Sequence, residues 1–130
     1  MPTILLAEDQ PITRELLRRL LANEGYTVHA AATGSEALAL LIDGVQTDLI
    51  ILDLLLPKMS GAELFETLRE HPTWRAIPVI VLTGSMSRTQ LNRARQLNAH
   101  AVMQKAKFEL DELLSEIRNA LRTKSEALPA

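Results

Sequence analysis

Five short apolar runs divide the 130-residue chain at regular intervals. They lie at residues 3–7, 27–31, 49–53, 78–82 and 100–104, and their length is typical of strands that are buried on both faces. Each interval between them carries apolar residues at helical spacing, which predicts five βα units in series. Strict alternation of strands and helices favours a parallel sheet that is covered by helices on both faces.

Caps and apolar stripes predict where the helices begin and what they bury. Pro11 suits the first turn of the first helix, which ends before Gly25; the second helix follows residues 33–35. Ser60 opens the third helix as part of a capping box, and Ser87 opens the fourth in a similar way. The residues expected to be buried are Ile12, Leu16, Leu17, Leu20 and Leu21; Ala37, Leu38, Leu41 and Ile42; Leu64, Phe65 and Leu68; Leu91, Ala94 and Leu97; and Leu110, Leu113, Leu114, Ile117 and Leu121.

These elements predict a three-layer α/β sandwich around a five-stranded parallel sheet. The commonest small arrangement of this kind has the strand order 2-1-3-4-5, which makes the first and third strands neighbours. We place a single domain at residues 1–122. Residues 123–130 carry no apolar stripe, and we expect a flexible C-terminal tail or the start of a linker there.

Composition narrows the partners that we expect. The 14 basic and 16 acidic residues give a net charge of -2 without long blocks of either sign, so no nucleic-acid or membrane contact is expected. The N-terminus lacks the pattern of a secretory signal and no run is long enough to span a bilayer, which favours a cytoplasmic protein. The absence of cysteine excludes thiolate metal sites, and His29, His71 and His100 lack metal-ligand spacing.

Acidic residues stand at the ends of two apolar runs. Glu8 and Asp9 follow the first run, and Asp53 ends the third. In the predicted strand order these positions meet at the carboxyl edge of the sheet, where parallel α/β folds bind ligands. Three carboxylates there would repel one another, and a hard cation such as Mg²⁺ is the simplest reason to gather them.

The acids divide into predicted metal-binding roles. Asp9 is expected to bind the ion directly, and Glu8 directly or through a water. Asp53 is expected to be both a ligand and a nucleophile, because a carboxylate can form an acyl phosphate. The backbone carbonyl of Leu55 is a candidate for a further ligand.

Two more polar residues follow the remaining strands. Thr83 comes just after the fourth apolar run, and Lys105 comes just after the fifth. The hydroxyl of Thr83 could donate a hydrogen bond to one phosphoryl oxygen, and the ammonium of Lys105 could pair with another. The combination predicts a site for phosphoryl transfer to Asp53.

These residues together resemble the receiver domain of two-component response regulators, up to about residue 122. The matching positions are Glu8 and Asp9, the segment 53–61, Thr83 with Gly84, and Lys105. The resemblance implies that Asp53 accepts a phosphoryl group from a sensor histidine kinase or phosphotransfer protein, while Glu8 and Asp9 hold Mg²⁺, for which Mn²⁺ could substitute. It also implies that Thr83 and Lys105 contact the phosphoryl group and couple it to a change of shape.

The resemblance implies a flavodoxin-like fold and a signalling switch, not an enzyme acting on a separate substrate. Mg-dependent self-phosphorylation and slow self-dephosphorylation are expected of such a switch. It would signal through contacts with a downstream protein, and a homodimer through the last helix and neighbouring elements is one arrangement to consider.

Two positions depart from the family pattern. Ala106 follows Lys105 where the family usually has a proline in a cis peptide, so we expect a trans bond here. Val102 stands where an aromatic side chain commonly reports phosphorylation. The fourth helix has few apolar residues, so it is either a switching element or simply an exposed helix. These features predict that the output, not the chemistry at Asp53, differs from the family.

Other functions fit the residues less well. A flavodoxin-like cofactor site needs a phosphate-binding loop after the first strand, and the acids Glu8 and Asp9 would repel a phosphate there. A hydrolase with an aspartyl intermediate usually has a second acid two residues after its nucleophile, where this chain has Leu55. A degenerate receiver that only docks partners stays open, because Val102 and Ala106 depart from the family.

Overall fold

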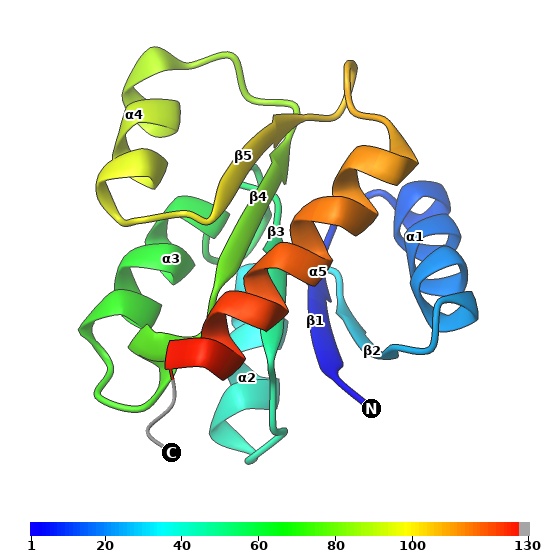
Figure 1. Ribbon diagram of the computed structural model, residues 1–130. Coiled ribbons are helices and arrows are strands. Elements are labelled where there is room, and N and C mark those ends of the chain that lie inside the picture. The colour runs from blue at the N-terminus through cyan, green and yellow to red at the C-terminus, as the bar shows by residue number, and fades with distance from the viewer. Residues whose placement is uncertain (128–130) are drawn as a thin grey trace.

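Five parallel strands form the middle layer of the computed structural model, which describes residues 1–127 (Figure 1). The strands are β1 (Thr3–Ala7), β2 (Thr27–Ala31), β3 (Leu49–Leu52), β4 (Val79–Thr83) and β5 (Ala101–Gln104). Their order across the sheet is β2-β1-β3-β4-β5, so the predicted topology is confirmed. Ala7 pairs with Leu52, which places the carboxyl ends of β1 and β3 side by side.

Helices cover both faces of the sheet, which confirms the three-layer sandwich (Figure 1). They are α1 (Pro11–Asn23), α2 (Gly34–Ile42), α3 (Gly61–Glu70), α4 (Arg88–Gln96) and α5 (Leu110–Ala127), with a short 3-10 helix, η1 (Trp74–Ala76), after α3. Helices α1 and α5 lie on one face, and α2, α3 and α4 lie on the other. The hydroxyl oxygens of Ser60 and Ser87 accept hydrogen bonds from the first turns of α3 and α4, which confirms their predicted starts.

The last helix extends to Ala127, past the predicted domain end at residue 122. Residues 128–130 of the predicted tail lie outside the described residues, and the role of this segment as a tail or linker stays a prediction. None of the helices within the described part combines the length and apolar character that crossing a membrane requires.

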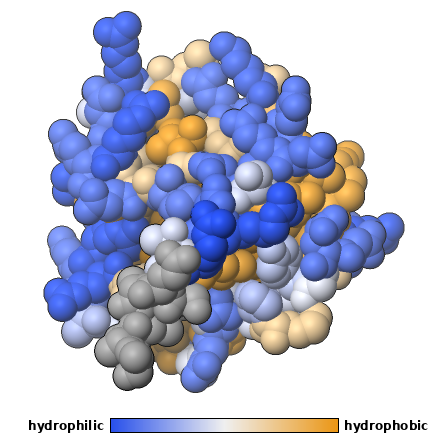
Figure 2. Space-filling model, viewed as in Figure 1, coloured by the Kyte–Doolittle hydropathy of each residue, from blue (hydrophilic) through white to orange (hydrophobic). Residues whose placement is uncertain are grey.

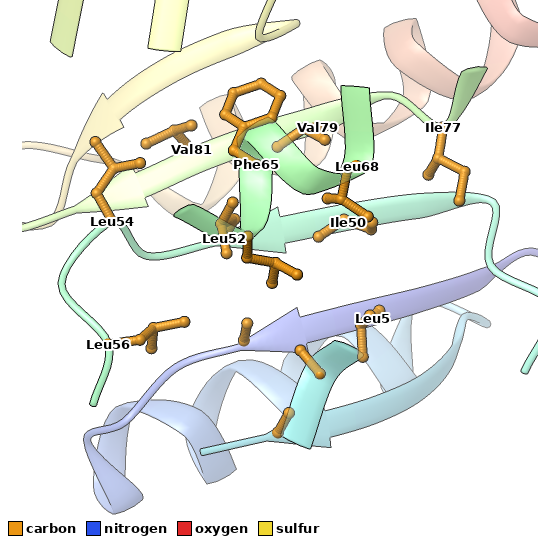
Figure 3. Close-up of a cluster of buried hydrophobic side chains, with 14 of the residues drawn as sticks. Leu5, Ile50, Leu52, Leu54, Leu56, Phe65, Leu68, Ile77, Val79 and Val81 are labelled. Carbon is orange, nitrogen blue, oxygen red and sulfur yellow. The ribbon is translucent and has the colours of Figure 1, made fainter. Parts of the chain in front are cut away.

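The sheet separates two hydrophobic cores. All four residues of β3 are buried, because alternate side chains point to opposite faces and both faces are covered. Ile50 and Leu52 pack with α2 and α3, whereas Leu49 and Ile51 pack with α1 and α5. Figure 3 shows the first of these cores, in which Phe65 of α3 lies among side chains of β3 and β4.

Three residues predicted to be buried are exposed instead. Ile12, Leu16 and Ile42 expose 85%, 55% and 65% of their surface, so the predicted stripes of the first two helices were too wide. A helix on a sheet buries only the stripe that faces the strands, and in α1 Leu17 and Leu21 occupy it. Ile12 and Leu16, one turn apart, share a neighbouring face that meets solvent.

The loop after β3 is packed closely between two helix N-termini. A Cβ atom on Gly61 would lie 1.8 Å from the carbonyl oxygen of Asp53, and one on Gly34 would lie 1.9 Å from that of Met59. Lys58 and Met59 adopt φ angles of 48° and 83°, in the left-handed region that residues other than glycine seldom adopt. The segment from Asp53 to Met59 is therefore held at each end by a contact that only glycine permits.

Arg69 joins α3 to the segments that precede β4 and follow α4. Its guanidinium lies over the ring of Phe65, at 4.9 Å, and burial lowers its pKa. It donates hydrogen bonds of 2.7 to 3.3 Å to the backbone carbonyls of Leu97, Arg75, Ile77 and Asn98. One side chain thus ties three segments of the chain together.

We expect Arg69→Met to lower the free energy of unfolding by about 2 kcal/mol, because hydrogen bonds from a charged group are lost and several carbonyls lose their donor. Urea unfolding followed by circular dichroism would measure the loss. Arg75→Met is the control, since that side chain is exposed, and we expect a change within about 0.5 kcal/mol. Equal stability of the two variants would contradict this role of Arg69.

Candidate metal and phosphoryl site

The three predicted acids lie together at the carboxyl ends of β1 and β3. The backbone N–H of Asp53 donates to the carbonyl of Ala7 at 3.1 Å, and that of Glu8 donates to Ala31 at 3.0 Å, so the sheet ladder continues into the site. Carboxylate oxygens of Glu8, Asp9 and Asp53 lie within 4.8 Å of one another. Glu8 and Asp53 expose only 1% and 3% of their surface, which makes their mutual repulsion costly without a cation.

A cavity of about 430 Å³ opens beside these acids, at the end of the sheet where the strands terminate. Its lining is Asp9, Gln10, Asp53, Leu55, Gly84 and Lys105. The structure therefore brings the predicted site residues from four strand ends into one place. The cavity also includes Gln10 and Gly84, which the sequence did not single out as ligand-facing residues.

Lys105 supplies the cation of the site in this structure. Its Nζ lies 2.6 Å from Oε1 of Glu8 and 2.7 Å from Oδ2 of Asp53. Burial by itself would lower the pKa of Lys105, but its hydrogen bonds to the two carboxylates outweigh that effect and raise the pKa. Burial raises the pKa of Glu8, a rise that the contact with Lys105 opposes. The ammonium thus stays charged beside two acids.

The carboxylate of Asp53 is held at both oxygens. Oδ1 accepts hydrogen bonds from the hydroxyl of Thr83 at 2.8 Å and from the backbone N–H of Leu55 at 3.0 Å, while Oδ2 contacts Lys105. Thr83 itself is fully buried. The contact that Leu55 makes is through its N–H, and the predicted role of its carbonyl as a metal ligand stays a prediction.

The turn after Lys105 follows the expectation from the sequence. The backbone N–H of Lys105 donates to the carbonyl of Thr83 at 3.0 Å, which continues the pairing of β4 with β5. No cis peptide bond occurs in the described residues, so the bond from Lys105 to Ala106 is trans, as predicted.

Arg14 is a residue of this site that the sequence analysis missed. Its Nη1 donates to the backbone carbonyls of both Glu8 and Asp9, at 3.0 and 3.3 Å. The guanidinium thereby fixes the turn that carries the acidic pair. Its position one turn into α1, close after the acids, was the available signal, since a helix that starts at Pro11 directs that turn back toward them.

The residues present fit a divalent cation. Three carboxylates supply the hard oxygen donors that Mg²⁺ and Mn²⁺ prefer, and Asp9 is only half-buried beside the cavity. Within the described residues, no other group of three or more acidic or histidine side chains converges in this way. The two buried acids are compensated by Lys105 here, and a bound cation would add to that compensation.

Comparison with known proteins points to the same family as the sequence motifs. The family model for the response regulator receiver domain matches residues 4–118. The transcriptional regulatory protein DltR of Streptococcus agalactiae serotype III is 35% identical over 125 residues, which make up 96% of this chain and 53% of that protein. The chain spans about half the length of such curated relatives.

Solved structures share the fold as well. A CheY-like receiver domain protein from Methanospirillum hungatei superposes with a TM-score of 0.88 at 28% identity, covering 97% of this chain and 98% of that one. The response regulator TrrA from Thermotoga maritima, solved in complex with Mg²⁺ and BeF, superposes with a TM-score of 0.80 at 34% identity. The match covers 93% of this chain and 100% of the TrrA chain.

Proposed function

This chain belongs to the family of response regulator receiver domains, and we propose that it accepts a phosphoryl group on Asp53 and thereby switches its contacts with other proteins. One observation carries the proposal: a buried carboxylate beside an open cavity has an ammonium on one oxygen and a hydroxyl on the other. A purely structural ion pair would need neither the cavity nor the two further acids.

The proposed step is transfer of a phosphoryl group from a phosphohistidine. A carboxylate oxygen of Asp53 forms a bond to phosphorus while the phosphorus–nitrogen bond breaks, and the electron pair stays on the imidazole of the donor. Lys105 lies where it could pair with a phosphoryl oxygen, and the hydroxyl of Thr83 could donate to another. Both groups already touch Asp53, so the site is organised before the donor arrives.

Glu8, Asp9 and Asp53 would hold the Mg²⁺, with the carbonyl of Leu55 as a further ligand and Mn²⁺ as a substitute. The bound ion would neutralise charge shared between the phosphoryl oxygens and the acids. Arg14 would keep the acidic turn in place through its hydrogen bonds to the backbone. The half-buried Asp9 gives an ion access from the cavity.

The exposed apolar surface of α1 supports a protein donor. Ile12 and Leu16 are exposed a few residues after Asp9, and Figure 2 shows apolar surface on the side of the molecule where α1 lies. Exposed apolar patches near a reaction site typically mark a protein contact. We propose that a histidine kinase or phosphotransfer protein covers this surface while its phosphohistidine reaches Asp53.

We expect Ile12→Arg to slow phosphotransfer from a histidine kinase that is active on the wild type by roughly tenfold, because an unpaired charge would enter an apolar contact. Labelling by acetyl phosphate should stay unchanged, since that small donor needs no docking surface. Ile42→Arg is the control, since Ile42 is also an exposed apolar residue but lies on α2. Equal slowing in both variants would refute a role for the α1 surface.

The proposed switch can be tested with beryllofluoride, which mimics an acyl phosphate. We expect beryllofluoride with Mg²⁺ to shift the amide signals of Leu55, Thr83 and α4 in a ¹H–¹⁵N spectrum, and chelation of Mg²⁺ to reverse the shifts. A degenerate receiver that acts only by docking predicts no response. An unchanged spectrum at Asp53 and its neighbours would therefore overturn the proposed function.

A further inference from the structure

A continuous series of hydrogen bonds leads from Asp53 to the first turn of α4. The hydroxyl of Thr83 donates to Asp53 at 2.8 Å, and the backbone N–H of Ser85 donates to the same hydroxyl at 3.1 Å. The hydroxyl of Ser85 donates to Oε1 of Gln90 at 2.5 Å and accepts from the backbone N–H of Ser87 at 3.3 Å. Ser87 caps α4 by accepting from the N–H of Gln90.

Burial protects the inner part of this series from competition by water. Thr83 is fully buried, Ser85 exposes 5% of its surface, and Gln90 is half-buried. Hydrogen bonds that are shielded in this way keep defined geometry, because losing a partner would leave a buried polar group unsatisfied. A movement of the Thr83 hydroxyl therefore shifts the backbone N–H of Ser85, which donates a hydrogen bond to it.

The opposite end of α4 is attached independently of Asp53. Arg69 of α3 donates to the carbonyls of Leu97 and Asn98, just after the helix ends. Arg93 forms an ion pair with Glu66 of α3 at 2.6 Å. The helix is thus tied to α3 at its C-terminal end, while its first turn is tied to the site.

The route from the Thr83 hydroxyl through the following loop to β5 is weaker than the route to α4. Val102 has no polar side-chain group with which to follow a change at Thr83, and it packs partly buried against the core that also includes Ala94 of α4. Gln104 of β5 donates a hydrogen bond to the sulfur of Met86, in the loop before α4, at 3.4 Å, and a thioether sulfur is a weak acceptor. The polar connection of Thr83 leads to α4 itself.

We propose that Ser85 and Gln90 are positioning residues that couple the orientation of the Thr83 hydroxyl to the first turn of α4. This inference rests on the proposed function. The Thr83 hydroxyl has one proton to donate, and at present it donates to Asp53. A phosphoryl group adds charged acceptor oxygens that form stronger hydrogen bonds, so Thr83 turns toward them and Ser85 follows. The bond from Ser85 to Gln90 then breaks or moves, and the start of α4 is released.

The test compares wild type with Gln90→Met, which keeps a similar size but cannot accept the hydrogen bond in the same way. We expect beryllofluoride with Mg²⁺ to shift the amide signal of Leu55 in both proteins. The accompanying shift at Leu91, in the first turn of α4, should fall by at least half in the variant. Gln96→Met makes the same change at an exposed position of α4 and should respond like wild type.

Reciprocity supplies a second readout, because two coupled sites affect each other equally. If the bond between Ser85 and Gln90 holds the unmodified arrangement, then breaking it should tighten beryllofluoride binding by roughly two- to tenfold, the effect of one net hydrogen bond. Ser85→Ala removes the same bond from the other side and should give the same direction of change. Thermal unfolding would show that both variants are folded.

The outcomes separate this inference from the function on which it rests. A wild-type spectrum without shifts around Asp53 refutes the proposed function, and the coupling with it. Shifts at both Leu55 and Leu91 in Gln90→Met, equal to those of wild type, leave the function intact and refute the coupling. Reduced Leu91 shifts in Gln96→Met as well would also refute it, since any change in α4 would then suffice.

Discussion

Asp53→Asn should abolish the increase in intact mass that acetyl phosphate with Mg²⁺ produces in the wild-type protein. The amide nearly matches the carboxylate in shape, and its oxygen can still accept from Thr83 and Leu55. It has no anionic oxygen with which to attack phosphorus, so the covalent step is lost while the fold is kept. Lys105 retains Glu8 as a partner at 2.6 Å, which limits the disturbance around it.

Asp43→Asn is the matched control for this experiment. Asp43 is an exposed acid at the end of α2, away from the cavity, and its substitution makes the same chemical change. We expect full labelling of that variant. Equal labelling of wild type and Asp53→Asn would show that another residue accepts the phosphoryl group, and would refute the assignment of Asp53.

The position of the site was predictable from the sequence because it depends on strand ends. Glu8 and Asp53 stand at the ends of fully apolar runs, which are typical of strands inside a sheet that is covered on both faces. The strand order places the carboxyl ends of these two strands side by side. Thr83 and Lys105 follow by the same reasoning. Side chains at strand ends are fixed by topology, so a correct fold places them without further information.

Side-chain exposure was less predictable because it depends on the angle at which a helix meets the sheet. Ile12 and Leu16 belong to an apolar pattern in the sequence, yet they face solvent, since Leu17 and Leu21 take the contact with the strands. The exposed apolar residues of α1 nevertheless carry information about a possible binding surface. A helix with more apolar residues than the core can accept leaves some of them on a second, exposed surface, and here that surface begins three residues after Asp9 in the chain.

Contacts between loops were the least predictable part. Lys58 and Met59 adopt positive φ angles without a glycine to announce them, and Arg14 reaches back to carbonyls of the preceding turn. The bond from Ser85 to Gln90 joins a loop to a helix through side chains that have no distinctive pattern. These interactions depend on tertiary geometry, whereas hydrophobic periodicity reports only which face of an element is buried.

Gly61→Ala should lower the free energy of unfolding by about 3 kcal/mol or more, near the upper end of the range for overpacked sites. The added Cβ would lie 1.8 Å from the carbonyl oxygen of Asp53 and 2.8 Å from Cα of Leu54, so backbone must move on one side or the other. A flexible side chain could rotate away from such a contact, but neither of these atoms belongs to one. Chemical unfolding in urea would measure the loss.

The same substitution should also slow labelling of Asp53 by acetyl phosphate, because the displaced backbone carries the acceptor and misplaced reacting groups lose rate steeply. Gly84→Ala separates this effect from a general intolerance of alanine at the site. Gly84 lines the same cavity, but a Cβ there meets no atom within 4 Å, so both stability and labelling should stay close to wild type. If Gly61→Ala were as stable and as readily labelled as Gly84→Ala, the close approach of α3 to Asp53 would not be what holds the acceptor in place.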